Sequence, residues 1–282
     1  MTQPQAASLA PVITAGAIVA GGAAFDGSAS LAAQTSLAAG FYASQAFLAA
    51  ASIRDVLAVW SQLNLRDVRS SWPPLRTALA SLIRDRFGQS ALMGQVYYGQ
   101  ARQAAGVLSV PPVINLPPPP EPLIQATLDS TGPYSLLGRI KTGQQVPQAS
   151  ENTGVQMSGA AQRLISNGAR QAVLQSVDAD AKAVGWMRVT SGNPCAFCAM
   201  LASRGAVYRS EDSAGFEAHS ACCCVAAPVF SHADVKATRD NPLYQQWQQA
   251  TKGLSGADAL KAWRTHWDGQ QNRDGVRVLP AA

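Results

Sequence analysis

The stretch VGWMRVTSGNPCAFCAMLASRG, residues 184–205, carries two kinds of structure in succession. Residues 184–192 alternate β-branched and aromatic residues with other types, which is typical of a strand. The segment from residue 195 onward has helical character and ends at Gly205. Two further short strands are expected around residues 206–209 and 223–229. A small antiparallel sheet beside helices predicts an α+β fold for this half of the chain.

The five cysteines of the chain all lie within residues 195–224. Cys195 and Cys198 form a C-x2-C pair, and this spacing lets two sulfurs on one tight turn face the same point. We expect no secretory signal, because no basic region precedes the apolar residues 9–24 and the first Lys or Arg is Arg54. In a reducing compartment, clustered thiols indicate metal binding or catalysis instead of disulfides.

A second pair of ligands must come from HSACCC, residues 219–224. If residues 222–224 begin a strand, Cys222 and Cys224 project to one face while Cys223 points away, where it packs or is exposed. His219 reaches the same point from the preceding loop. The preferred ligands are Cys195, Cys198, His219 and Cys224, with Cys222 as the substitute or as an accessory thiol. A closed set of this kind is typical of structural zinc, which replaces core volume that short strands cannot supply.

Clustered cysteines can also serve purposes other than zinc binding. Thiols can be buried without any metal, because cysteine is a common core residue. A zinc deaminase also contains P-C-x-x-C, but it needs an upstream His or Cys ligand, and none precedes Cys195. A Cys–His hydrolase needs one activated thiolate, whereas His219 stands among several thiols. A thioredoxin-like site needs a βαβ pattern, which is missing around this C-x2-C. We therefore expect a protein that is not an enzyme.

The N-terminal half reads as a helical hairpin over residues 43–106. Residues 43–63 carry apolar side chains at helical spacing, and this helix is expected to begin further upstream. A second helix is expected to follow Ser71 as N-cap, with two prolines in its first turn, and to end at Gly106. Two long helices joined by a short polar turn should lie antiparallel. Residues 1–42 are expected to form a low-charge arm.

A proline-rich strap, residues 107–122, separates this hairpin from the rest of the chain. Its seven prolines cannot continue a helix or occupy a central strand, so the strap should be an extended linker. Residues 123–230 are expected to form the α+β core that holds the cysteines. This core should begin with a short helix interrupted near residue 132, and a longer helical run over residues 150–182 should contain breaks.

The C-terminal tail, residues 231–282, is expected to be helical. The segment SGADALKAWRTHW, residues 255–267, begins with a Ser-x-x-Asp signature and places Trp263 and Trp267 one turn apart. An amphipathic hairpin folded onto the protein's own core is the favoured interpretation. The alternative is a docking element whose tryptophans insert into a partner, because aromatic anchors dominate the energetics of interfaces.

The composition restricts the classes of function. Hydrophobic residues make up 47% of the 282 residues and charged residues 14%, and the abundant alanine favours close-packed helices. The net charge of +5 comes from scattered basic residues, so DNA binding is permitted but not indicated. Membrane contact is not expected, because the apolar residues 9–24 are shorter than a membrane span and contain Pro11 and three glycines.

Taken in order, the strand, NPCAFCAML, the short VY strand, HSACCC and VAAPVF resemble the MuF-like minor capsid (head morphogenesis) proteins of tailed bacteriophages. In that family C-x2-C is followed by a loop and an H-x-x-C-x-C element. SWPPLR at residues 71–76 and VYY at residues 96–98 look like the versions found in actinobacterial phages. The resemblance covers residues 40–230. One departure is Cys223, which stands where the family usually has a basic residue or histidine, so the choice between Cys222 and Cys224 stays open.

The resemblance implies a virion component, present in few copies in the capsid interior near the portal and assembled in the host cytoplasm. Its expected partner is the portal protein during prohead assembly. The major capsid or scaffolding protein and DNA are further implied partners, with DNA packaging or ejection as a further role. The alternative function is a zinc-containing nucleic-acid-binding module that contacts the packaged genome, whose binding to DNA should weaken with salt.

Overall fold

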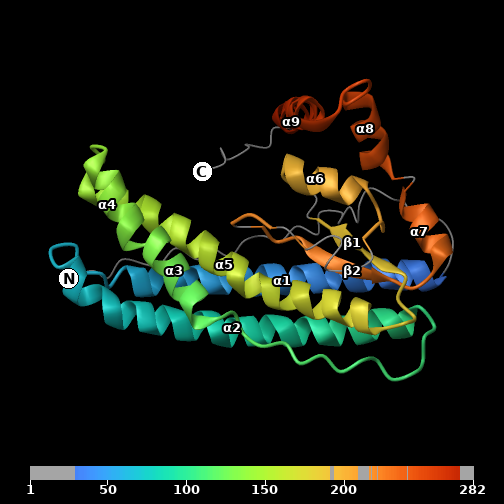
Figure 1. Cartoon of the computed structure of the whole chain (residues 1–282), viewed down its shortest axis with the longest axis horizontal. Coiled ribbons are helices and arrows are strands. Elements are labelled where there is room, and N and C mark those ends of the chain that lie inside the picture. Colours follow the sequence, from blue (N-terminus) through green and yellow to red (C-terminus); the bar gives the residue numbers. More distant parts are fainter. Residues whose placement is uncertain are drawn as a thin grey trace, which may run out of the picture.

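The computed structural model describes residues 29–190, 194–208, 216, 218–220, 222–239 and 241–273. Residues 1–28 of the expected arm and the last residues of the tail lie outside this description. The described elements follow in this order: α1 (Ala29–Trp60), α2 (Val68–Ala104), α3 (Glu121–Thr131), α4 (Pro133–Lys141), α5 (Val146–Ala179), β1 (Gly185–Val189), α6 (Ala196–Ser203), β2 (Val225–Val229), α7 (His232–Arg239), α8 (Pro242–Ala250) and α9 (Gly256–Arg273). Helices α1, α2 and α5 pack on one another and support the small sheet near one end, as Figure 1 shows. The fold is α+β, as predicted.

Helix α2 begins earlier than predicted, because its N-cap is Asp67 and not Ser71. The Asp67 carboxylate accepts a hydrogen bond from the Ser70 N–H at 3.1 Å. Aspartate caps a helix as well as serine does, so Asp67 could start the helix one turn before Ser71. The two prolines therefore did not mark the first turn. Pro73 and Pro74 lie inside the helix instead of in its first turn.

The C-terminal end of α2 is tied to the strap and to α5 by a buried arginine. Gly106, with φ of 79°, follows the C-cap, so the predicted end of the helix is confirmed. Arg102 is 3% exposed, and its Nε donates to Asp180 Oδ2 at 2.6 Å. Its Nη2 donates to the Ser109 hydroxyl at 2.8 Å, at the beginning of the strap. From there the strap runs extended alongside α2 (Figure 1), and the Gln95 side chain donates to the Ile114 carbonyl at 3.1 Å.

Helix α5 is continuous, and the breaks predicted for this run are wrong. Gly168 lies at a close approach between α5 and α2, not at a helix end. A Cβ atom at Gly168 would lie 2.4 Å from the Phe87 carbonyl oxygen and 3.0 Å from the Ala91 nitrogen. Gly94 of α2 makes the same approach from the other side, where a Cβ would lie 2.7 Å from the Ala169 oxygen. The glycines are therefore needed for packing between the two backbones.

This close approach gives a first prediction. Gly168→Ala should destabilise the protein by about 1–3 kcal/mol, because the added methyl group meets backbone atoms that cannot turn aside. The matched control is Gly88→Ala in α2, where an added Cβ meets nothing within 4 Å. That change should stabilise the helix by up to about 1 kcal/mol. Urea unfolding of the two variants measures both effects, and equal stability of the two would contradict the packing role of Gly168.

Two buried apolar clusters hold the helices and the sheet together. The first lies between α1, α2, α3, α4 and α5 and includes Trp60, Trp72, Ile83, Leu128 and Met157. The second lies where α1, α2 and α5 meet the sheet and includes Phe41, Tyr97, Val173, Trp186 and Val225. The sheet thus packs against the long helices, and α6 contacts β1.

The sheet has two strands in the described part of the chain instead of the three predicted. Strands β1 and β2 pair antiparallel, with Gly185 opposite Val229 and Val189 opposite Val225. The third predicted strand is reduced to one bridge between Trp186 and Tyr208, whose rings stack with centroids 4.4 Å apart.

Helix α1 begins at Ala29, upstream of residue 43 as expected, and is apolar along much of its length. Its segment Gln34–Trp60 is long and apolar enough, by length and composition, to cross a membrane. A third of its most apolar window (33%) is buried inside the protein. Leu48, Val56 and Trp60 are among its buried side chains, as expected for a helix that contributes to a core.

The C-terminal tail folds onto the protein's own core, as the favoured interpretation predicted. Trp263 is 1% exposed and Trp267 is 8% exposed, and both pack against α6 and α8. Helix α7, which begins at His232, lies within the segment that was expected to be helical.

Candidate metal centre

The C-x2-C pair lies at the start of α6. Cys195 is the N-cap residue, and its sulfur accepts a hydrogen bond from the Cys198 N–H at 3.4 Å. Cys198 follows in the first turn and is 2% exposed, whereas Cys195 is exposed. The cap geometry therefore turns both sulfurs toward the same side of the helix end, which is what a shared ligand position requires.

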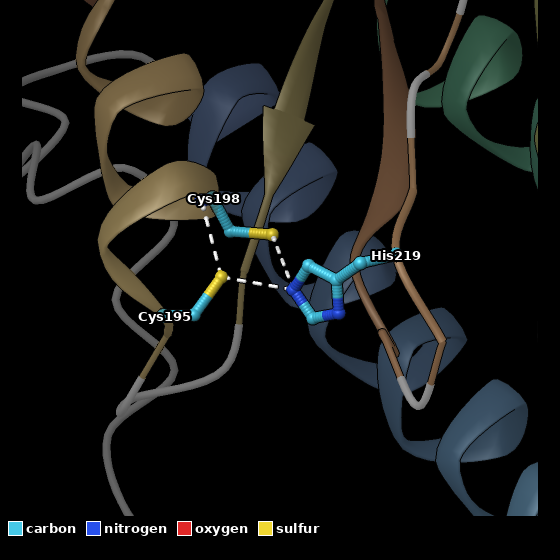
Figure 2. Close-up of side chains that lie close together, drawn as sticks. All are labelled: Cys195, Cys198 and His219. Carbon is cyan, nitrogen blue, oxygen red and sulfur yellow. Dashed lines mark hydrogen bonds between the residues drawn. The ribbon is translucent and has the colours of Figure 1, made fainter. Parts of the chain in front are cut away.

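His219 meets this pair from the loop before β2, as Figure 2 shows. Its Nε2 atom lies 2.9 Å from the Cys195 sulfur and 4.0 Å from the Cys198 sulfur. Its Nδ1 atom lies 2.7 Å from the Ser220 carbonyl oxygen. Because a carbonyl only accepts, Nδ1 carries a proton, and Nε2 is the ring nitrogen that faces the thiols.

Two more thiols join the same cluster from the segment that leads into β2. Cys222 is 3% and Cys224 is 5% exposed, and the Cys222 sulfur lies 3.6 Å from the Cys198 sulfur. Donor atoms within 4.8 Å of one another form two groups, Cys195 with Cys198 and His219, and Cys198 with Cys222 and Cys224. The structure therefore brings together all five predicted ligand residues, with Cys198 common to both groups.

Hydrogen bonds within the cluster divide the charge among the thiols. The contact with Cys198, followed by that with His219, lowers the pKa of Cys195 to about 4. The same contact with Cys195 raises the pKa of His219 to about 9. The hydrogen bond from Cys198 lowers the pKa of Cys222 to about 2. Cys198 itself has a raised pKa, because it donates hydrogen bonds to Cys195 and Cys222. Thiolate, the form that binds a metal, is thus favoured at Cys195 and Cys222.

The types of donor atom fit zinc. A tetrahedral zinc with bonds of about 2.3 Å to sulfur and about 2.0 Å to nitrogen separates its donor atoms by about 3.5–3.8 Å. The sulfur–sulfur distance of 3.6 Å lies in this range, and the two sulfur–nitrogen distances, 2.9 and 4.0 Å, lie on either side of it. Thiolate and imidazole donors, without a carboxylate, are the set found at structural zinc sites.

Comparison with known proteins gives the family. Residues 32–250 match the family model described as VG15 protein. All five candidate ligands lie within this range. The chain belongs to the VG15 family. This is a family of phage proteins, so the phage origin implied by the resemblance is confirmed. No curated protein and no solved structure matches the chain significantly.

In this VG15 protein, α5 holds the backbone of the second ligand segment. Arg170 is 2% exposed, and it donates to the Cys222 carbonyl from Nη2 at 2.6 Å and to the Cys224 carbonyl from Nε at 3.0 Å. Gln162, about two turns earlier on α5, also donates a hydrogen bond to the Cys222 carbonyl at 3.0 Å. Sequence reasoning missed both residues. Their signal is faint, since each is a polar residue on the otherwise apolar face of a long helix.

A second buried arginine approaches the cluster from β1. Arg188 is 2% exposed, and its Nη1 lies 4.0 Å from the Cys198 sulfur. Its guanidinium lies 3.7 Å from the centre of the Phe216 ring, and that of Arg170 lies 5.0 Å from the same ring. In the described part of the chain no carboxylate pairs with Arg170. The thiols of Cys222 and Cys224 are therefore groups whose negative charge Arg170 can balance.

Cys223 differs from its neighbours, as the strand alternation predicts. It is half-buried and belongs to neither donor group. Its sulfur lies 3.8 Å from the Gln162 side-chain nitrogen, on the side of α5. It therefore offers a control for experiments on the other four thiols.

Proposed function

We propose that this VG15 protein is a minor capsid (head morphogenesis) protein that associates with the portal during prohead assembly and has no enzymatic role. Family membership supports a phage component. The observation that carries the structural role is the convergence of four thiols and one imidazole from two separate segments at the edge of a two-stranded sheet. Such a cluster cross-links a module whose sheet is too small to stabilise itself.

The proposed metal is a structural zinc. Cys195, Cys198 and His219 supply three ligands, and Cys222 supplies the fourth because its sulfur is the one 3.6 Å from the Cys198 sulfur. Cys224 is then the accessory thiol, which reverses the order of preference expected from the sequence. When bound, zinc would join the start of α6 to the segment before β2. The role of this chain's own residues is to hold the donors in place and to keep water away from the three buried sulfurs.

The cluster also contains a Cys195–His219 pair of the kind that cysteine hydrolases use. A nucleophile requires one thiolate directed at a substrate. Here Cys198 and Cys222 lie in contact with the same network and are buried, so they have no role in such a mechanism. A structural metal site uses all of these groups, and we therefore propose the structural role.

Assembly experiments test the capsid role. In proheads produced from the phage's portal, scaffolding and major capsid proteins, this protein should be incorporated in few copies. Proheads assembled without the portal are the matched control and should lack it. Quantitative mass spectrometry of purified particles measures both. Absence of the protein from proheads and virions alike would overturn the proposal, and incorporation without the portal would overturn the choice of partner.

A further inference from the structure

The tail of the protein makes two hydrogen bonds to the backbone on either side of Cys195. The indole N–H of Trp267 donates to the Pro194 carbonyl at 2.8 Å. The indole N–H of Trp263 donates to the Ala196 carbonyl at 2.7 Å. Both tryptophans belong to α9, about seventy residues further along the chain. An indole N–H can only donate, and when it is buried its partner fixes the orientation of the ring and of the backbone it meets.

These bonds are part of a larger contact between the tail and α6. Trp263 packs between Trp247 and Trp267, with ring centroids 5.4 and 5.2 Å away. The cluster buries Ala199 and Met200 of α6. At the other end of α6, the Asn241 side chain, which caps α8, donates to the Ser203 carbonyl at 3.0 Å. The α8–α9 hairpin therefore holds α6 at both of its ends, as its position over α6 in Figure 1 suggests.

Cys195 is the candidate ligand that most needs such support. Cys198, Cys222 and Cys224 are buried, and Arg170 of α5 holds the backbone of the last two. Cys195 is exposed and lies at the N-terminal end of the short helix α6. Its sulfur can meet His219 at 2.9 Å only if the backbone before and after it keeps its direction. The two carbonyls that α9 binds are those of the residues immediately before and after Cys195.

We propose that the α8–α9 hairpin is a positioning element of the metal centre, in which Trp263 and Trp267 fix the backbone around Cys195 so that its sulfur can bind zinc. The inference rests on the proposed zinc. It also has a reciprocal consequence: if docking of the tail favours zinc binding, zinc binding must favour docking of the tail by the same free energy. Helix α9 lies beyond the residues matched by the family model, so this function is assigned from the structure of this chain alone.

The test removes one N–H and keeps an aromatic ring at the same position. In Trp267→Phe the zinc affinity, measured by competition with a chromophoric chelator, should fall about ten- to hundredfold, as found for residues that orient metal ligands. The matched control is Trp247→Phe, a change in the same aromatic cluster at a residue with no described bond to the Cys195 segment. Its zinc affinity should stay within about twofold of the unaltered protein, because packing alone is affected.

A second measurement uses the unaltered chain, so it does not depend on how a variant folds. Trypsin cleavage at the exposed Lys252 and Lys261 in the hairpin should become faster when zinc is removed with a chelator. If the unaltered protein binds no zinc, the proposed metal fails, and this inference with it. If it binds zinc but Trp267→Phe has the same affinity, or cleavage is equally fast with and without zinc, the positioning role alone is overturned.

Discussion

Cys198→Ser should abolish zinc binding and unfold the segment between β1 and β2. Cys198 belongs to both donor groups, is 2% exposed, and lies 3.6 Å from the Cys222 sulfur, so no other residue can replace it. Structural zinc contributes on the order of 10 kcal/mol to the folding of a small module. The unaltered protein should contain one zinc per chain by metal analysis, and the variant none. Its melting temperature should be lower, and chelation of the unaltered protein should have the same effect.

Cys223→Ser is the matched control, because Cys223 is a neighbouring thiol that belongs to neither donor group. It should keep the zinc content and the melting temperature of the unaltered protein. Zinc retained in Cys198→Ser, or no metal in the unaltered protein, would contradict the proposed site. The same assay identifies the fourth ligand: Cys222→Ser should lose zinc and Cys224→Ser should retain it, and the opposite result would restore the order expected from the sequence.

The enzymatic alternative predicts a different outcome at Cys195. If Cys195 were a nucleophile activated by His219, Cys195→Ser would lose activity and keep its fold. If Cys195 is a structural ligand, the variant loses zinc and stability together. A thermal melt of Cys195→Ser in the presence of zinc therefore separates the two roles without knowledge of any substrate.

The sequence was sufficient for the parts of the site that depend on local spacing. C-x2-C at the start of a helix, and alternation in the segment before a strand, are properties of three or four consecutive residues, and the structure shows both. The antiparallel helices and the end of α2 at Gly106 were also accessible, because apolar periodicity and a C-terminal glycine are local signals.

The parts that could not be predicted depend on contacts between distant segments. Gly168 reads as a helix break, and only the approach of α2 to within van der Waals distance explains why it lies inside α5. Arg170 reads as an ordinary polar residue of α5 until the carbonyls of Cys222 and Cys224 are seen beside it. Periodicity gives the face on which a residue lies, but it gives neither the identity nor the register of the partner.

Arg170→Met should destabilise the protein and weaken zinc binding together. The change removes the donors that Arg170 supplies to the Cys222 and Cys224 carbonyls at 2.6 and 3.0 Å. The Cys222 carbonyl keeps Gln162 as a donor, whereas the Cys224 carbonyl loses its side-chain donor. One unsatisfied buried acceptor costs about 1–3 kcal/mol, so the expected loss of stability is about 1–3 kcal/mol. A melting temperature lower by several degrees follows for a chain of this size. The exposed Arg54→Met is the control for loss of one positive charge, and its effect should be within about 0.5 kcal/mol.

Charge and geometry at Arg170 can be separated with a second variant. Burial lowers the pKa of the Arg170 guanidinium, and the charges of Cys222 and Cys224 oppose that effect, so cation and thiolates stabilise one another. Arg170→Lys keeps a cation near the thiolates, but a single ammonium cannot replace the fork that binds both carbonyls. Its zinc affinity should lie between those of Arg170→Met and the unaltered protein, while its melting temperature stays close to that of Arg170→Met. If Arg170→Met matched the unaltered protein in both measurements, the carbonyls must find other donors, and α5 would have no part in holding the metal ligands.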